Sequence, residues 1–165
     1  MTLKLKAALT AGCLLTAGTM LGSGALVPSL AHEGHVHAEF SAGEPGDPKK
    51  PARVVKITMR EDGSKKFFEP ARIEVRRGEQ IRFTLQNDGS GPHEFALATA
   101  AENRKHADEM KKFPDMEHHE PNAKRVAANN SIDLVWKFTK RGEFQFACLI
   151  PGHYDAQMLG AVIVQ

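Results

Sequence analysis

The sequence is poor in cysteine. It has two cysteines among 165 residues, and Cys13 falls in an N-terminal stretch with the pattern of an export leader. Without that leader Cys148 has no partner within the chain, which excludes a framework of internal disulfides. A solitary thiol in an oxidising compartment tends to oxidise or cross-link unless it is buried or bound to a metal. Both interpretations of Cys148 stay open until its neighbours are considered.

The N-terminus has no uninterrupted hydrophobic run. Residues 7–27 are largely apolar, but Gly, Thr and Ser break the run, two lysines precede it and small residues follow it at 29–31. This is the pattern of a secretory signal peptide, with a transmembrane anchor as the alternative. We therefore expect residues 1–31 to be a cleaved signal peptide. The exported protein would begin at His32, lie in the periplasm and keep no membrane anchor.

An excess of charge is also lacking once the signal peptide is set aside. Removing Lys4 and Lys6 from the 22 basic residues leaves as many basic as acidic residues, of which there are 20. A neutral domain has no long-range attraction for a polyanion, so we expect no nucleic-acid partner. The share of hydrophobic residues is 41%, which suits one ordinary globular domain.

The remaining chain divides into an arm and a domain. Residues 32–50 are rich in His, Gly, Pro and charge, with little to bury, and predict a flexible N-terminal arm. Residues 51–165 form the predicted domain. Within it, apolar and polar residues alternate in short runs separated by turns, which predicts an all-β fold, an antiparallel β-sandwich or barrel. A helical pattern covers about Ala100–Phe113 and stops at Pro114. The alternating runs cover residues 54–60, 71–77, 80–87, 131–138, 143–148 and 160–165.

A cluster of metal-ligand residue types lies near the C-terminus. In "FACLIPGHYDAQM", Cys148, His153 and Met158 are evenly spaced between two strand-like runs. His93, in "SGPHEFAL", offers a further imidazole at a turn-to-strand junction. Two imidazoles, a thiolate and a weak thioether suit copper in electron transfer, whereas zinc would favour a closed tetrahedral set with more thiolate. By itself Met158 would more often fill a core than bind a metal.

The longer stretch "GEFQFACLIPGHYDAQMLGAVIV" resembles the C-terminal copper loop of the cupredoxins, the blue-copper family of plastocyanin, azurin and pseudoazurin. The resemblance runs from about Pro51 to Gln165. It implies a Greek-key β-sandwich with one long helix-containing insertion. It also implies four type 1 copper ligands, which are His93, Cys148, His153 and Met158.

One departure qualifies this resemblance, and the neighbours of Cys148 exclude a related class of enzymes. In plastocyanin and azurin the residue after the first histidine is usually Asn, which hydrogen-bonds toward the copper thiolate, whereas here it is Glu94. The surroundings of the metal, and hence its potential, cannot be carried over. Multicopper oxidases place histidines beside the cysteine, whereas here Ala147 and Leu149 flank it. We therefore expect no enzyme activity.

Further histidines and methionines lie outside this loop. Thioether with imidazole suits Cu(I), and groups of imidazoles suit Cu(II), so these residues are candidates for additional copper sites. The alternatives are an accidental polar tail and a solvated loop in which Met110 packs inward. The candidates are His32, His35 and His37 in the arm, and His106, Met110, Met116, His118 and His119 in the insertion.

Such Met- and His-bearing insertions resemble those of periplasmic copper-tolerance cupredoxins. The sequence thus predicts a periplasmic type 1 copper protein that contributes to copper tolerance, with redox-active copper and extra copper sites. Copper ions would be its main partner, together with a redox partner protein. The alternative is a single-site electron shuttle between respiratory partners, in which the extra histidines are incidental.

Overall fold

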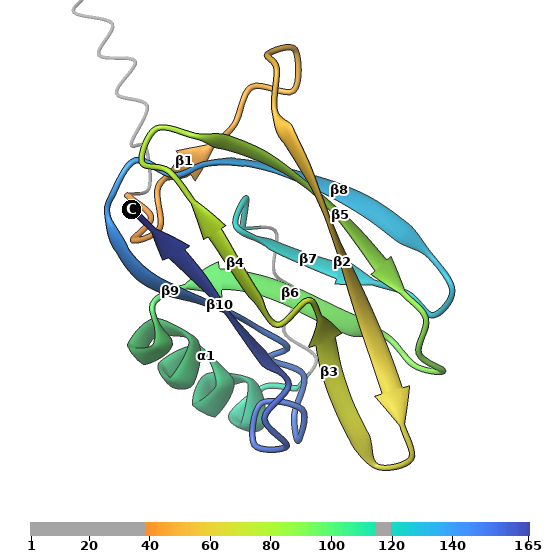
Figure 1. The fold of residues 1–165 in the computed structure, drawn as a ribbon. Coiled ribbons are helices and arrows are strands. Elements are labelled where there is room, and N and C mark those ends of the chain that lie inside the picture. The colour runs from red at the N-terminus through yellow and green to blue at the C-terminus, as the bar shows by residue number, and fades with distance from the viewer. Residues whose placement is uncertain (1–38, 115–119) are drawn as a thin grey trace, which may run out of the picture. The chain divides into compact units, whose positions relative to one another are not determined.

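The protein forms two β-sheets of five strands each, seen in a computed structural model that describes residues 39–114 and 120–165 (Figure 1). The first sheet has the order β1-β8-β5-β2-β3, and the second has the order β4-β10-β9-β6-β7. The strands of the first sheet are β1 (Glu44–Pro45), β2 (Arg53–Asp62), β3 (Lys65–Glu69), β5 (Gln80–Asn87) and β8 (Ser131–Lys137). Those of the second are β4 (Arg72–Val75), β6 (His93–Ala98), β7 (Ala123–Val126), β9 (Gly142–Ala147) and β10 (Leu159–Val164).

This arrangement confirms the predicted β-sandwich with one helix-containing insertion. It differs from the prediction in strand direction, because β2 pairs with β5 and β4 pairs with β10 in parallel. The wholly antiparallel sandwich that the alternation favours is therefore wrong for these two pairs. Alternation reports which residues face the core, but it carries no information on which strand lies alongside.

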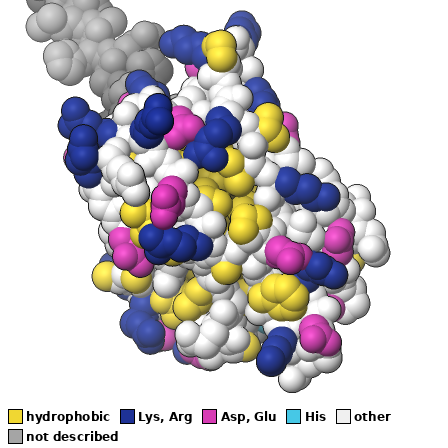
Figure 2. Space-filling view, in the orientation of Figure 1, with side chains coloured by type: hydrophobic (Ala, Val, Ile, Leu, Met, Phe, Trp, Pro, Cys, Tyr) yellow, Lys and Arg dark blue, Asp and Glu magenta, His cyan; other side chains and the backbone are white. Residues whose placement is uncertain are grey.

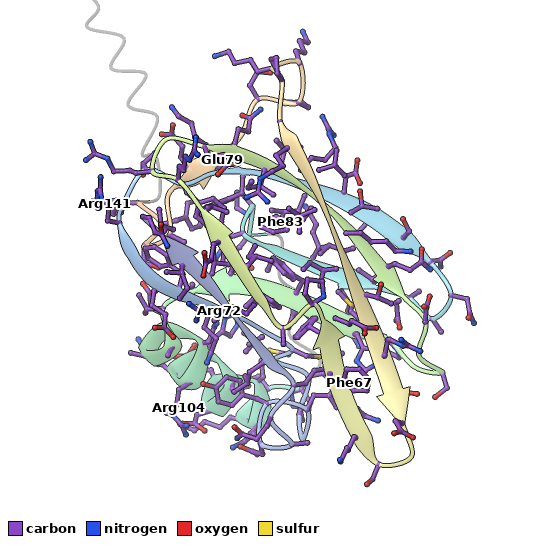
Figure 3. All side chains as sticks on the ribbon, viewed as in Figure 1. Phe67, Arg72, Glu79, Phe83, Arg104 and Arg141 are labelled. Carbon is purple, nitrogen blue, oxygen red and sulfur yellow. The ribbon has the colours of Figure 1, made fainter. Side chains whose placement is uncertain are left out.

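Aromatic side chains fill the space between the sheets. Alternation along β5 directs Phe83 inward (Figure 3). There it meets Phe95 of the other sheet, with ring centroids 5.3 Å apart. Phe95 stacks in turn on Phe146, at 5.1 Å between centroids. Phe146 is fully buried on β9 and lies two residues before Cys148, which directly follows that strand. Core packing thus fixes the strand that carries the thiol.

The packed domain begins earlier than the sequence indicates. Ala42 is fully buried, and its carbonyl oxygen accepts a hydrogen bond of 3.3 Å from Nε1 of Trp136. Phe40 packs edge-on against the same indole, with centroids 5.3 Å apart. The predicted boundary at residue 51 is therefore corrected: the segment from residue 39 onward packs on the sandwich. Residues 32–38 of the predicted arm lie outside the described residues.

A helix, α1 (Ala100–Lys112), connects β6 and β7, close to the predicted 100–113. Thr99 and Glu102 form a capping box that satisfies backbone N–H groups at its start. Its buried side chains, Asn103, Ala107 and Met110, face the second sheet, beside which α1 lies in Figure 1. No helix among the described residues is long and apolar enough to cross a membrane.

Surface charges of both signs are mixed. On the face shown in Figure 2, Lys and Arg side chains are interspersed with Asp and Glu around a strip of apolar side chains. Several charges are paired, such as Arg60 with Glu69 at 2.6 Å and Arg82 with Asp133 at 3.3 Å. Exposed pairs of this kind contribute little to stability.

Candidate metal centre

Three ligand side chains from distant parts of the sequence converge at one end of the second sheet. His93 is the first residue of β6, Cys148 directly follows β9, and His153 lies in the turn that leads to β10. Sγ of Cys148 is 3.2 Å from Nδ1 of His153 and 4.0 Å from Nδ1 of His93. Ligand atoms of the three residues all lie within 4.8 Å of one another. This spacing allows one ion to contact all three.

Met158 closes the loop on which two of these residues lie. Its carbonyl oxygen accepts a hydrogen bond of 3.1 Å from the N–H of Cys148, and its own N–H donates to the carbonyl of His153 at 3.0 Å. The side chain is fully buried in the same apolar core as Cys148. The backbone thus ties Met158 to the two residues that precede it in the motif.

The loop itself is a series of tight turns. The N–H of His153 donates to the carbonyl of Ile150 at 2.9 Å, and that of Ala156 donates to Gly152 at 3.1 Å. Gly152 has φ of +87°, a left-handed conformation that glycine adopts without strain. The sequence Pro-Gly-His therefore turns the chain sharply and brings the imidazole back over the thiol.

The thiol of Cys148 is held neutral in the absence of a metal. Its side chain is fully buried, and burial raises the pKa of the thiol to about 12. Backbone N–H groups of Glu94 and Ile150 oppose this effect, and the first of them donates to Sγ at 3.3 Å. A bound cation would supply the charge that a buried thiolate lacks.

Both imidazoles are also neutral. Burial lowers the pKa of His93, and it lowers the pKa of His153 to about 4, helped by the neighbouring His93. The two rings lie 5.1 Å apart between centroids. His93 is fully buried, whereas His153 is partly exposed, so one imidazole of the candidate site reaches the surface. Neutral imidazole is the form that binds metals.

A carboxylate lies behind His93. Oε1 of Glu61 is 3.3 Å from Nε2 of His93, the ring nitrogen that faces away from the thiol. Sequence analysis did not single out Glu61, because it occupies a position at the end of β2 that looks like any polar surface residue. No local signal distinguishes it, since its partner is 32 positions away on the other sheet.

The helix α1 supports the loop from the side. Tyr154, the residue after His153, is 5% exposed and packs in a small apolar cluster with Met110 and Leu149. Arg104 extends from α1 (Figure 3), and its guanidinium lies 5.5 Å from the centre of the tyrosine ring. The insertion that contains α1 thus packs against one side of the loop that carries His153. Sequence analysis did not single out Tyr154 either.

The other predicted copper-binding residues are only partly described. His106 and Met110 lie one turn apart on α1. His106 lines a cavity of about 200 Å³ together with Glu39, Glu102 and Glu120, whereas Met110 is buried, with 2% exposure. The remaining candidates lie outside the described residues, and they are His32, His35, His37, Met116, His118 and His119.

The donor set fits copper. A single thiolate, two imidazole Nδ1 atoms and a buried thioether nearby are soft or borderline ligands, and the site offers no cluster of hard oxygen donors. Among the described residues this is also the one group of three such side chains with metal-ligand spacing. The geometry therefore provides a possible centre for one ion.

Comparison with known proteins decides the family. Residues 55–165 match the copper binding proteins of the plastocyanin/azurin family. The chain belongs to this family. Copper is accordingly the metal of this cupredoxin, and His93, Cys148 and His153 form its possible metal site.

Two relatives share most of this cupredoxin's length. The chain is 50% identical over 137 residues to the copper-resistant cuproprotein CopI of Rubrivivax gelatinosus, which covers 82% of this chain and 81% of that protein. It is 30% identical over 171 residues to the copper-resistant cuproprotein CopI of Pseudomonas aeruginosa, with 86% and 92% covered. The resemblance to copper-tolerance cupredoxins that the sequence indicates is thereby confirmed.

Solved structures support the fold. Auracyanin B superposes with a TM-score of 0.61 at 20% identity, covering 75% of this chain and 96% of that chain. The reduced auracyanin of Roseiflexus castenholzii gives a TM-score of 0.58 at 18% identity, with 70% and 99% covered. At these identities the likeness concerns the cupredoxin fold alone.

Proposed function

We propose that this cupredoxin is a periplasmic copper-tolerance protein with a type 1 centre. Its ligands would be Nδ1 of His93 and His153, the thiolate of Cys148 and the axial thioether of Met158. The observation that carries this assignment is the approach of the Cys148 sulfur to both Nδ1 atoms inside a buried site. The tolerance role is supported by relatives whose names describe them as copper-resistant.

The residues of the site prepare it for reversible electron transfer. Bound copper supplies the one-electron chemistry, by cycling between Cu(II) and Cu(I). His93 begins β6 and Cys148 directly follows β9, and both are fully buried, so we expect their positions to change little between the two oxidation states. His153 is the partly exposed ligand and provides the short route from the site to a redox partner at the surface.

An enzymatic role is disfavoured by the surroundings of the thiol. Ala147 and Leu149 flank Cys148, and both are buried apolar residues that bind no second metal. Copper oxidases of related fold couple this position to a further copper cluster, for which histidines would be needed here. We therefore infer a binding and electron-transfer protein rather than an oxidase.

We further propose that the His-rich arm and the Met/His loop bind additional copper. Support comes from the cavity of about 200 Å³ that His106 lines. Glu39 and Glu120 line the same cavity, and they are the first described residues after the two segments that hold the other candidates. The described residues that directly follow these two segments therefore lie beside the same imidazole. Export through a cleaved signal peptide, residues 1–31, completes the proposal.

Copper stoichiometry of a Cys148→Ser protein that begins at His32 tests this function. We expect it to take up nearly colourless Cu(II) with the magnetic signature of nitrogen ligation. Deleting residues 32–37, replacing His118 and His119, and His106→Ala should each remove part of that copper. Lys105→Ala, an exposed neighbour on α1, is the control and should remove none.

The same variants should be compared in cells. A strain that lacks the protein should be more sensitive to copper, and the arm deletion should restore less tolerance than the intact protein does. If Cys148→Ser binds no copper above background and the strain that lacks the whole protein tolerates copper normally, the extra sites are disproved. The single-site electron shuttle then becomes the better explanation.

A further inference from the structure

A residue of the opposite sheet contacts the imidazole of His93 on the side that faces away from Cys148. Glu61 belongs to β2 of the first sheet, whereas His93 begins β6 of the second, and Oε1 of the carboxylate lies 3.3 Å from Nε2 of the ring. His93 is fully buried, and its Nε2 forms no hydrogen bond among the described residues, so the approach of Glu61 to 3.3 Å is a contact at ion-pair distance. Glu61 is therefore the acceptor available to that nitrogen.

The carboxylate is itself held in one orientation. Its Oε2 accepts hydrogen bonds from the N–H and the hydroxyl of Ser90, at 2.9 and 2.7 Å. Its Oε1 accepts from Nζ of Lys66 at 3.2 Å, and Lys66 is the cross-strand partner of Glu61 on β3. With one oxygen occupied by Ser90, the other is directed toward His93. These donors favour the ionised form, which accepts hydrogen bonds only.

The loop before His93 is built around this contact. A side chain at Gly89 would place its Cβ 2.8 Å from Nε2 of His93 and 3.1 Å from Cδ of Glu61. The N–H of Gly89 donates to Oδ1 of Asn87 at 2.8 Å, and Nδ2 of Asn87 donates to the carbonyl of Gly91 at 2.9 Å. The buried Asn87 thus holds Gly89 in this position. Any side chain there would come between the imidazole and the carboxylate.

The position of the carboxylate dictates the protonation pattern of the ring. An ionised acceptor beside Nε2 favours the tautomer with the proton on Nε2, which leaves the lone pair on Nδ1. Nδ1 is the atom that faces the Cys148 sulfur. A negative charge at this distance also stabilises a Cu(II) site more than a Cu(I) site, because Cu(II) carries the larger charge.

We propose that Glu61 is the positioning residue for the copper ligand His93, setting its tautomer and lowering the reduction potential of the centre. The proposal rests on the type 1 site proposed above. The acceptor oxygen of Glu61 sets the tautomer, and its negative charge lowers the reduction potential, so the two effects can be separated. Lys66 and Ser90 act on His93 through Glu61, by holding that carboxylate in place.

Two substitutions separate these properties. Glu61→Gln keeps an acceptor oxygen and removes the charge, so the visible spectrum should survive while the reduction potential rises. If the affinity for Cu(II) falls tenfold relative to the affinity for Cu(I), the reduction potential rises by about 59 mV for one electron. Glu61→Leu removes both the acceptor oxygen and the charge. The Cu(II) affinity of this variant should fall about 10- to 100-fold, the usual effect of replacing the residue that orients a ligating histidine.

The matched control is Glu69→Gln. Glu69 lies on β3 of the same hairpin and is ion-paired with Arg60 at the surface, so its replacement removes the same charge away from His93. Its potential and spectrum should equal those of the unmodified protein. In the Cu(I) form, nitrogen-15 NMR should show a slowly exchanging proton on Nε2 of His93 in the unmodified protein and in Glu61→Gln, and fast exchange in Glu61→Leu.

The outcomes distinguish a failure of this proposal from a failure of the type 1 assignment on which it rests. If the unmodified protein lacks the intense visible band, the type 1 site is wrong. If the band is present but Glu61→Gln has the potential of Glu69→Gln, the charge effect is refuted. If Glu61→Leu keeps full Cu(II) affinity and a protected Nε2 proton, the positioning role is refuted.

Discussion

The backbone N–H of Glu94 donates to the sulfur of Cys148 across 3.3 Å. This contact joins β6 to the end of β9, and it is made by the residue directly after the ligand His93. Glu94 stands where plastocyanin and azurin usually have Asn, yet the contact comes from its backbone. A hydrogen bond to the thiolate at this position therefore does not require the asparagine side chain.

Replacing Cys148 by Ser should abolish the intense visible absorption of the copper protein. A hydroxyl cannot act as the donor of the thiolate-to-copper charge transfer, and a hydroxyl oxygen is a harder ligand than sulfur. Absorption spectra of the copper-loaded variant provide the measurement, with circular dichroism to verify that the sandwich is folded. Persistence of the coloured band would disprove the type 1 assignment.

Met158→Gln should keep copper but lower the reduction potential and alter the spectrum. In the proposed type 1 site the thioether of Met158 would be a weak ligand that tunes the metal, and an amide oxygen would favour Cu(II) more. Because Met158 is fully buried in the core, burial of the polar amide should also cost some stability. Voltammetry and metal analysis test this prediction, and complete loss of copper would contradict it.

Copper uptake should become stronger as the pH rises. Burial raises the pKa of the Cys148 thiol to about 12, so at neutral pH its proton must leave when copper binds. The pKa of His153 is lowered to about 4, so above pH 5 this imidazole has no proton to lose. Uptake should thus release about one proton per ion, and affinity should rise about tenfold per unit between about pH 7 and 9.

Calorimetry of Cu(II) uptake in buffers of different ionisation enthalpy measures this proton release. Cys148→Ser is the control and should release none at this site. A release near two protons would mean that an imidazole is charged in the metal-free protein, and a pH-independent affinity would mean that the thiol is already ionised.

Tyr154→Ala should destabilise the protein and loosen the copper loop. The ring is 5% exposed against α1, so its removal leaves a cavity and costs about 3 kcal/mol in the free energy of unfolding. Tyr154→Phe is the matched control. Its hydroxyl contacts the Ala100 carbonyl and Oε1 of Gln145 at the long distances of 3.5 and 3.4 Å, so its loss should cost under about 1 kcal/mol.

Urea unfolding of the metal-free variants gives these differences, and the rate of copper loss to a chelator reports on the loop. We expect the Ala variant to release copper faster than the Phe variant. Equal rates in both variants and in the unmodified protein would show that α1 does not support the loop.

Much of the fold follows from the sequence because its signals are local. Alternation such as that of Ile81, Phe83 and Leu85 shows which face of a strand is buried, and all three are fully buried in the sandwich. The helix is delimited by Thr99 with Glu102 at its start and Pro114 after its end. Such signals act within a few residues, and a strand or a helix cap needs no other part of the chain to be recognised.

The candidate metal site could be predicted for a similar reason. Cys148, His153 and Met158 lie on one loop, so their spacing alone brings the three together between two strands. His93 was found through its residue type and its place at the start of a strand. The structure brings it to the thiol, because β6 is the neighbour of β9.

Only the tertiary structure decided which strands are neighbours and what surrounds the ligands. The parallel pairing of β2 with β5, the packing of Ala42 under Trp136 and the approach of Glu61 to His93 join segments far apart in sequence. Each depends on the register and stacking of whole sheets, to which a single polar or small residue contributes no pattern of its own. Composition and spacing therefore determined the candidate ligands, while the packing of the two sheets determined the residues that surround them.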